Sequence, residues 1–277
     1  MDGGAVRCRR RPRRPWRRGR RRAVTSPAVP SPIDLLLLPC AGASATMYLR
    51  WRRSLPAWIR LVPLELPGRG ARHGEPFVED YDVLVGQLCD AVDAPAVAPT
   101  GRYVLLGHSM GALLAHGLAR RLRERSRPLP DALIVSASAA PAMRESIRFQ
   151  GPLDDASLIA DLRRQGGTPD AVFENPELLR MTLDALAADY RVCASFRHEA
   201  PGVPLPMPVH VLAGRADAIP PASLAAWAAE TTGRFTLDWF DGGHFFIRQQ
   251  ESLVLAALER ALRPLASGAS HAGVVAA

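Results

Sequence analysis

Residues 107–111 read GHSMG and contain the serine whose surroundings most clearly suggest chemistry. The apolar run Tyr103–Leu106 precedes this pentapeptide, and an amphipathic helical pattern that starts at Met110 follows it. A serine between two glycines, at a turn from a strand into a helix, is typical of a nucleophile elbow, which exposes the serine hydroxyl above the sheet. The pattern predicts Ser109 as a nucleophile. The alternative is a glycine-containing strand–turn–helix connection that does no chemistry.

A serine hydroxyl is a weak nucleophile unless a base accepts its proton, and the chain has seven histidines. His244 lies in residues 241–246, DGGHFF, directly after the apolar run Phe235–Phe240. Loops at the carboxyl ends of parallel strands share one edge of the sheet, so this loop should reach the elbow. His108 should point away from the hydroxyl, because it lies within the elbow itself. We therefore predict His244 as the base; the alternative is a loop histidine without a role.

A carboxylate that orients the histidine is expected between the serine and the histidine in chain order. Asp217 follows the apolar run Val209–Ala213, so it should lie at the same sheet edge. Its alternative role is that of a turn-forming aspartate beside two prolines. Three weaker candidates are Asp189, Asp238 and Asp241. The first lies in a predicted helix, and the other two lie too close in sequence to the histidine loop.

Two backbone N–H groups are expected to stabilise the oxyanion that forms during acyl transfer. One should come from Met110, the residue after the predicted nucleophile. The other should come from the loop 39–44, which follows the apolar run Leu35–Leu38, and we predict Ala41 as this donor. Cys40 in the same loop could itself be a nucleophile, but no base lies near it in the sequence.

Short apolar runs that alternate with helical patterns should position these residues. The predicted strands are Leu35–Leu38, Leu61–Leu66, Tyr103–Leu106, Ala132–Ser136, Val209–Ala213 and Phe235–Phe240. The predicted helices between and after them are Leu84–Val92, Met110–Leu122, Ser223–Thr231 and Ser252–Leu262. Continuous apolar runs suit strands that are buried on both faces. The alternation predicts an α/β fold with a mostly parallel central sheet and helices on both faces.

Residues 143–200 interrupt this alternation, because they contain no strand-like run. Asp154–Gln165 and Pro176–Val192 have helical patterns, and a Gly-Gly-Thr-Pro sequence separates them. A long helical insertion between two strands of a sheet is often a lid over the site, so we predict a lid here. The alternative is an ordinary pair of helices that covers one face of the sheet.

Composition places the chain among globular proteins, with 277 residues, of which 48% are hydrophobic and 22% charged. Its four cysteines are far apart, which argues against a zinc ribbon and fits a reducing compartment. No apolar run reaches the roughly 18 residues of a membrane span. We expect three parts: a disordered tail over residues 1–32, a catalytic domain over 33–263 and a flexible end over 264–277.

The net charge of +8 comes from the N-terminal end of the chain. Residues 1–22 contain 11 arginines and one acidic residue, so the rest of the chain carries a net charge of −2. This segment could be an unstructured tail without a role, a contact for nucleic acid or membrane, or the start of an export signal. An export signal that is cleaved near Cys40 would remove part of the predicted site. We therefore expect a tail without a role and a cytoplasmic protein.

Five stretches of the chain, in order, resemble the type II thioesterases that accompany polyketide synthases and non-ribosomal peptide synthetases. They are LPCAGASATMYLRW (38–51), LELPGRG (64–70), LLGHSMGALLAHGLA (105–119), LAGRADAIPP (212–221) and FDGGHFFI (240–247). Residues 163–179 of the insertion look like this family too, and the resemblance covers about residues 33–262. It implies an α/β-hydrolase fold with a helical lid.

The resemblance also implies an activity and a partner. The family hydrolyses acyl groups from the phosphopantetheine arm of acyl or peptidyl carrier protein domains, which restores blocked synthases. We expect the chain itself to hold no cofactor and no metal. We also expect no specific nucleic acid partner and no membrane partner. Two other functions remain open: a general carboxylesterase or lipase, and a non-catalytic binding protein with an arginine-rich tail on a hydrolase fold.

Overall fold

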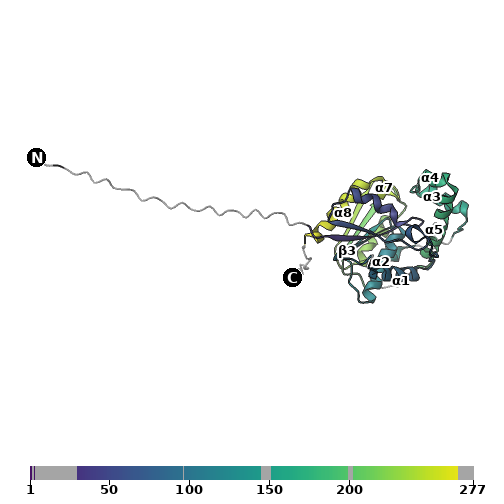
Figure 1. The fold of residues 1–277 in the computed structure, drawn as a ribbon, viewed down its shortest axis with the longest axis horizontal. Helices are drawn as coiled ribbons and strands as arrows, with labels where there is room; N and C mark the ends of the chain where they lie inside the picture. The colour runs from purple at the N-terminus through teal and green to yellow at the C-terminus, as the bar shows by residue number, and fades with distance from the viewer. Residues whose placement is uncertain (2, 4–29, 96, 145–150, 199–201, 268–277) are drawn as a thin grey trace.

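The computed structural model describes residues 1, 3, 30–95, 97–144, 151–198 and 202–267 (Figure 1). Six parallel strands form one sheet in the order β2-β1-β3-β4-β5-β6. Their bounds are β1 Ile33–Leu38, β2 Ile59–Pro63, β3 Arg102–His108, β4 Ala132–Ser136, β5 Val209–Gly214 and β6 Phe235–Phe240. The predicted parallel sheet is therefore confirmed.

Helices cover both faces of this sheet. The helices α1 (Tyr81–Asp93) and α2 (Met110–Glu124) pack on one face, and α8 (Glu251–Ala266) packs on the other with the 3-10 helix η1 (Ala45–Arg53). The short helices α6 (Pro221–Ala225), η5 (Ala226–Glu230) and α7 (Phe246–Gln249) complete these layers. This arrangement confirms the predicted α/β architecture.

Strand β1 shows why the sequence reads as a continuous apolar run. Leu36 and Leu38 belong to the cluster that contains α1 and α2, whereas Leu35 and Leu37 belong to the cluster that contains η1 and α8. Alternate side chains of a strand point to opposite faces, and both faces are covered here. Every residue of β1 is consequently buried.

The insertion between β4 and β5 contains three helices, α3 (Asp155–Gln165), α4 (Asp170–Glu174) and α5 (Pro176–Ser195). The two predicted helices are confirmed, and α4 is an addition that is too short to give a periodic pattern. α3 and α5 share a small apolar cluster of their own, formed by Leu158, Leu183, Leu186 and Tyr190. The C-terminal part of α5 instead joins the main core. α5 thus connects the insertion to the body of the molecule (Figure 1).

Some element boundaries differ from those predicted. The second strand ends at Pro63, so Leu64–Leu66 forms a loop after the strand. The helix expected over residues 223–231 is divided into α6 and η5, and α8 continues to Ala266. Most of the expected N-terminal tail and residues 268–277 lie outside the described residues.

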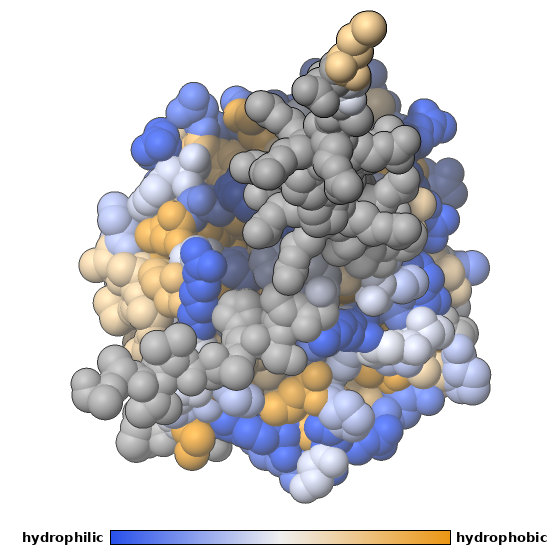
Figure 2. Space-filling model, turned by 90° about the vertical axis from the view of Figure 1, so that its left-hand side faces the viewer, coloured by the Kyte–Doolittle hydropathy of each residue, from blue (hydrophilic) through white to orange (hydrophobic). Residues whose placement is uncertain are grey.

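Two further features bear on contacts with partners: the character of the visible surface and the length of the helices. Figure 2 shows the end of the molecule on the side of the N-terminus, where hydrophilic and hydrophobic side chains are interspersed over the visible surface. Among the helices that the structure describes, none combines the length and the apolar character needed to cross a membrane.

Candidate active site

Ser109 occupies the turn between β3 and α2, and its backbone has φ 55° and ψ −114°. A positive φ is strained for a residue with a side chain, so the surrounding structure must enforce it. The two flanking glycines show how. A Cβ on Gly107 would lie 2.0 Å from the carbonyl oxygen of Gly111, and a Cβ on Gly111 would lie 2.3 Å from that of Leu38. The elbow predicted from the sequence is therefore closely packed against backbone.

Three side chains predicted to act together form a hydrogen-bonded chain. His244 Nε2 lies 2.9 Å from Ser109 Oγ, and His244 Nδ1 lies 2.9 Å from Asp217 Oδ2. The side chains of His244 and Asp217 are only 11% and 6% exposed. In this geometry Nδ1–H donates to the carboxylate, which leaves Nε2 free to accept the serine proton.

Backbone contacts between two loops place Asp217 and His244. The N–H of Arg215 donates to the carbonyl of Phe240 at 2.8 Å, and the N–H of Ala216 donates to that of Gly242 at 2.9 Å. A Cβ on Gly214 would lie 2.5 Å from the carbonyl oxygen of Gly243. The loops after β5 and β6 therefore pack against each other without intervening side chains.

The weaker acid candidates have other partners. Asp189 is fully buried and pairs with Arg69, and Asp238 lies 3.3 Å from Arg260. The third candidate, Asp241, lies 3.3 Å from Arg215 at the surface. Of these carboxylates, Asp217 alone has a hydrogen bond to His244 in the described part of the chain.

The other buried histidines are also engaged elsewhere. His108 is fully buried beside the site, where its Nδ1 lies 2.9 Å from Ser136 Oγ, and burial lowers its pKa far below the ordinary value. His116 lies 3.1 Å from Glu230. Neither imidazole is within hydrogen-bond distance of Ser109, so the described geometry supports the choice of His244.

The predicted oxyanion donors Ala41 and Met110 line the same cavity as Ser109. Met110 is the first residue of α2, where the backbone N–H has no partner within the helix, and Ala41 lies in the loop after β1. Cys40 is buried beside them, and burial raises the pKa of its thiol to about 11. A thiol held in its neutral form is a poor nucleophile, which argues against the alternative role of Cys40.

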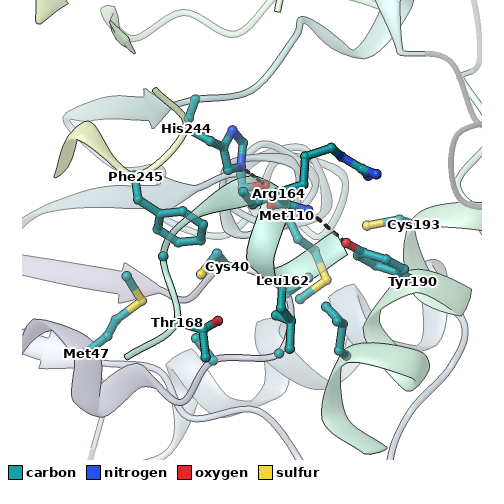
Figure 3. A pocket seen from close by; sticks show the side chains of 18 of the residues that line it. Cys40, Met47, Met110, Leu162, Arg164, Thr168, Tyr190, Cys193, His244 and Phe245 are labelled. Atoms are coloured by element: carbon teal, nitrogen blue, oxygen red, sulfur yellow. Dashed lines mark hydrogen bonds between the residues drawn. The ribbon is translucent and has the colours of Figure 1, made fainter. Parts of the chain in front are cut away.

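A cavity of about 710 Å³ opens from Ser109 and His244 toward the insertion. Its volume lies within the range typical of small-molecule sites. Apolar side chains from η1, α3, α4, α5 and the loop after β5 contribute to the lining; they include Met47, Leu162, Val172, Leu186 and Ile219. Figure 3 shows His244 and Phe245 on one side of this cavity, with Tyr190 and Cys193 from α5 on the other. The arrangement can hold an acyl chain next to the serine.

The insertion contacts the histidine loop directly. Phe245 follows His244, and its ring packs so closely on Gly167 that a Cβ there would lie 2.2 Å from the ring. Arg248 donates a hydrogen bond to the carbonyl of Gly167 and lies 5.5 Å from the centre of the Phe245 ring. These three residues, which we call the insertion contact, were not predicted from the sequence.

Two charged residues near the loop 39–44 were also missed by the sequence analysis. Arg69 forms a buried ion pair with Asp189, and Glu65 accepts hydrogen bonds from Ser44 and Ala45. Both lie in the stretch LELPGRG, so the available signal was their position in a stretch that resembles the family. Their contacts could not be read from spacing.

A parallel sheet with a strained serine after β3, an aspartate after β5 and a histidine after β6 defines an α/β hydrolase. The sequence from residue 34 to residue 262 matches the thioesterase domain family. The chain belongs to this family and is a thioester hydrolase.

Individual relatives agree with this assignment. The chain is 35% identical to the thioesterase PikA5 of Streptomyces venezuelae, over 81% of this chain and 79% of that protein. Among solved structures, the RedJ thioesterase from the prodiginine biosynthetic pathway in Streptomyces coelicolor is 32% identical with a TM-score of 0.75, covering 87% of this chain and 96% of that one. The type II thioesterase BorB from the borrelidin biosynthetic cluster is 37% identical with a TM-score of 0.74, covering 86% and 96%.

Proposed function

We propose that this enzyme hydrolyses acyl thioesters from the phosphopantetheine arm of acyl or peptidyl carrier protein domains, in the editing of polyketide or non-ribosomal peptide synthesis. The observation that carries the proposal is the hydrogen-bonded chain from Ser109 through His244 to Asp217, which opens into the 710 Å³ cavity. BorB is a type II thioesterase from a biosynthetic cluster, which supports the same class of substrate.

The first half of the reaction transfers the acyl group to the enzyme. Ser109 Oγ attacks the thioester carbonyl while His244 Nε2 takes its proton, and Asp217 stabilises the imidazolium that results. The negative charge that develops on the carbonyl oxygen is held by the N–H groups of Ala41 and Met110. The carbon–sulfur bond then breaks, and His244 returns the proton to the leaving pantetheine thiolate.

The second half regenerates the serine. His244 takes a proton from a water molecule, which attacks the acyl carbon, and the same two N–H groups hold the second oxyanion. The bond to Ser109 Oγ breaks, the serine recovers a proton from His244, and the carboxylic acid leaves. The proposed steps use residues of this chain and one water molecule, and the phosphopantetheine belongs to the partner.

The insertion serves in this proposal as a lid that shapes the entrance for the arm. Its contribution to the cavity includes Leu162, Thr168 and Leu186. Binding energy from the arm can then position the thioester carbonyl at Ser109. Because every proposed partner is a biosynthetic protein domain, we also place the enzyme in the cytoplasm.

Two exposed arginines of the helix η1 are proposed to meet the acidic surface of a carrier. The helix η1 begins at the cavity, where Thr46 and Met47 line it, and carries Arg52 and Arg53 toward its end. Arg50 on the same helix has its charge paired with Glu251. Arg52 and Arg53 therefore remain the better candidates on this helix.

The test uses the same acyl group in three substrates: a thioester of a carrier protein, a thioester of a small thiol and an ester of an alcohol. Mass spectrometry follows the loss of the acyl group. We expect the highest kcat/KM on the carrier protein, with a lower value for R52E/R53E and an unchanged value for the control R260E/R263E on α8, since complementary charge raises the rate of encounter. Equal efficiency on all three would favour a general esterase, and no hydrolysis with retained carrier binding would favour a binding protein.

A further inference from the structure

The loop that carries Ala41 contains a tight turn over residues 40–43. The N–H of Ala43 donates to the carbonyl of Cys40 at 3.1 Å, and Gly42 has a φ of +73°. A positive φ at the third residue is the signature of a type II turn. The peptide between Ala41 and Gly42 is the central peptide of this turn, and its orientation distinguishes type II from type I.

A carboxylate from α5 holds the central peptide. The N–H of Gly42 donates to Asp189 Oδ2 at 2.7 Å, and Asp189 is fully buried. The neighbouring turn of α5 packs against the same glycine, since a Cβ on Gly42 would lie 3.3 Å from the side chain of Leu186. The type I orientation would turn this N–H away from the buried carboxylate, which would lose this hydrogen bond.

Arg69 completes the arrangement from a third segment of the chain. Its guanidinium donates to both oxygens of Asp189, at 2.5 and 2.7 Å, and also to the carbonyl of Ala43 at 3.4 Å. Arg69 itself is only 7% exposed and lies over the ring of Phe77. Two planar groups joined by a pair of hydrogen bonds have a fixed relative orientation.

Stability alone is a weak explanation for this pair. Removing two charges from water costs free energy, and well-packed apolar residues are often as stabilising as a buried ion pair. A buried pair can instead specify one conformation. Here the pair contacts Gly42 and Ala43, the two residues that directly follow the proposed oxyanion donor Ala41.

The other end of the loop has a separate attachment. Glu65 accepts hydrogen bonds from Ser44 Oγ at 2.5 Å and from the N–H of Ala45 at 3.1 Å. The loop is thus held by Asp189 near Ala41 and by Glu65 at the start of η1. Loss of Asp189 would free the turn while leaving the attachment at Glu65 in place.

We propose that Arg69 and Asp189 are positioning residues that hold the turn over residues 40–43 so that the N–H of Ala41 faces the oxyanion. The pair also links helix α5 of the insertion to the catalytic centre. This inference rests on the proposed role of Ala41 in catalysis. Oxyanion donors act through preorganised geometry, so small displacements of the turn reduce the rate.

Two double variants separate positioning from stability. R69M/D189L replaces the pair by apolar residues and removes the acceptor for Gly42, whereas R69Q/D189N removes the charges but keeps an amide oxygen that can accept the same hydrogen bond. The readouts are kcat and KM on a small-thiol thioester, and the inhibition constant of a trifluoromethyl ketone that forms a tetrahedral adduct with the serine. Circular dichroism and a fluorophosphonate titration give the folded and active fractions.

For R69M/D189L we expect a fall in kcat of about 10- to 100-fold, since loss of a whole oxyanion donor costs about 10²–10³. KM should stay within about twofold, and the affinity for the ketone should fall in parallel with kcat. R69Q/D189N should recover most of both losses. A folded R69M/D189L enzyme with wild-type kcat and wild-type ketone affinity overturns the proposal.

If R69M/D189L does not fold, Asp189→Glu tests the positioning proposal instead. This variant keeps the charge pair but moves the acceptor relative to Gly42 by one methylene, so kcat and ketone affinity should both fall. Unchanged values for both in folded Asp189→Glu enzyme also overturn the proposal. If the fluorophosphonate does not label wild-type enzyme and Ser109→Ala stays active, the proposed function itself has failed, which is a distinct result.

Discussion

The sheet edge and the helical insertion hold their functional residues in different ways. At the sheet edge, Ser109 and the loops of Asp217 and His244 are fixed mainly by backbone approaching backbone, at glycines that leave no room for a Cβ. The insertion is joined to that edge by side chains, through the Arg69–Asp189 pair and through the insertion contact of Gly167, Phe245 and Arg248. The difference indicates that the reacting groups tolerate little change, whereas the cavity above them can be varied.

Substitutions in the two regions should therefore have different kinetic effects. A change at the sheet edge removes a group that acts in the transition state, so kcat should fall while the fold and KM are kept. A change where the insertion lines the cavity alters how the acyl chain and the arm are received, so KM should change most. The Arg69–Asp189 pair is the exception, because it holds the turn that carries Ala41 and should therefore affect kcat.

The largest effect is expected for His244→Ala, which removes the base. The kcat for a small-thiol thioester should fall about 10⁵- to 10⁶-fold. The thermal midpoint should change little, because His244 lies in a turn of the chain rather than in a helix or strand. Steady-state kinetics together with thermal unfolding check both expectations, and a loss of less than about tenfold would remove His244 from the mechanism.

Asp217→Asn is expected to have the next largest effect. The amide cannot accept from Nδ1–H in the way the carboxylate does, so the imidazole takes the wrong tautomer, and kcat should fall about 10³- to 10⁴-fold. A matched control is Asp241→Asn, whose carboxylate lies in the same region but pairs with Arg215 at the surface. Similar kinetics for the two variants would contradict the assigned role of Asp217.

Gly167→Ala tests the insertion side of the comparison. Its new methyl group would overlap the Phe245 ring, and such overpacking costs about 1–3 kcal/mol. We expect KM for a long acyl thioester to rise about fivefold, while kcat stays within about threefold of the wild-type value. A fivefold rise in KM corresponds to about 1 kcal/mol, the lower end of the cost of overpacking. Gly151→Ala is the control, because a Cβ on Gly151 would meet no atom within 4 Å. Equal effects of the two substitutions would show that the insertion contact has no kinetic role.

The smallest effect is expected from deletion of residues 1–22. The first strand begins at Ile33 and the first residue at the cavity is Cys40, so kcat/KM on a small thiol should stay within about twofold. Binding to a polyanion such as heparin should weaken strongly, because the deletion removes a charge of +10 and such binding depends on charge. A folded truncation that has lost activity would assign these residues a catalytic contribution.

The sequence predicted the sheet edge well because its signals are local. The apolar run and the two glycines around the serine lie within one short segment, and Asp217 and His244 each follow a strand-like run closely. The strands β4 and β6 have the predicted bounds. The second strand ended earlier than predicted, since the apolar pattern continues through Leu64 and Leu66 after the strand has ended.

The contacts of the insertion could not be predicted in the same way. Arg69 and Asp189 are 120 residues apart, and neither residue differs in its local pattern from an ordinary surface charge. Asp189 was considered only as a weaker candidate for the acid that orients His244. Its burial and its bond to Gly42 depend on how α5 packs on the body, which spacing along the chain does not reveal.

The most direct test of the central claim follows the acyl group during a single turnover. An acyl-loaded carrier protein is mixed with excess enzyme, the reaction is quenched at short times, and the peptide that contains Ser109 is examined by mass spectrometry, with Asp217→Asn included as a slower enzyme. We predict an acyl increment on Ser109 that rises as the carrier loses its acyl group and falls as the free acid forms, together with no release by Ser109→Ala. Wild-type release rates from Ser109→Ala, with no increment on the Ser109 peptide of the active enzyme, would contradict the account.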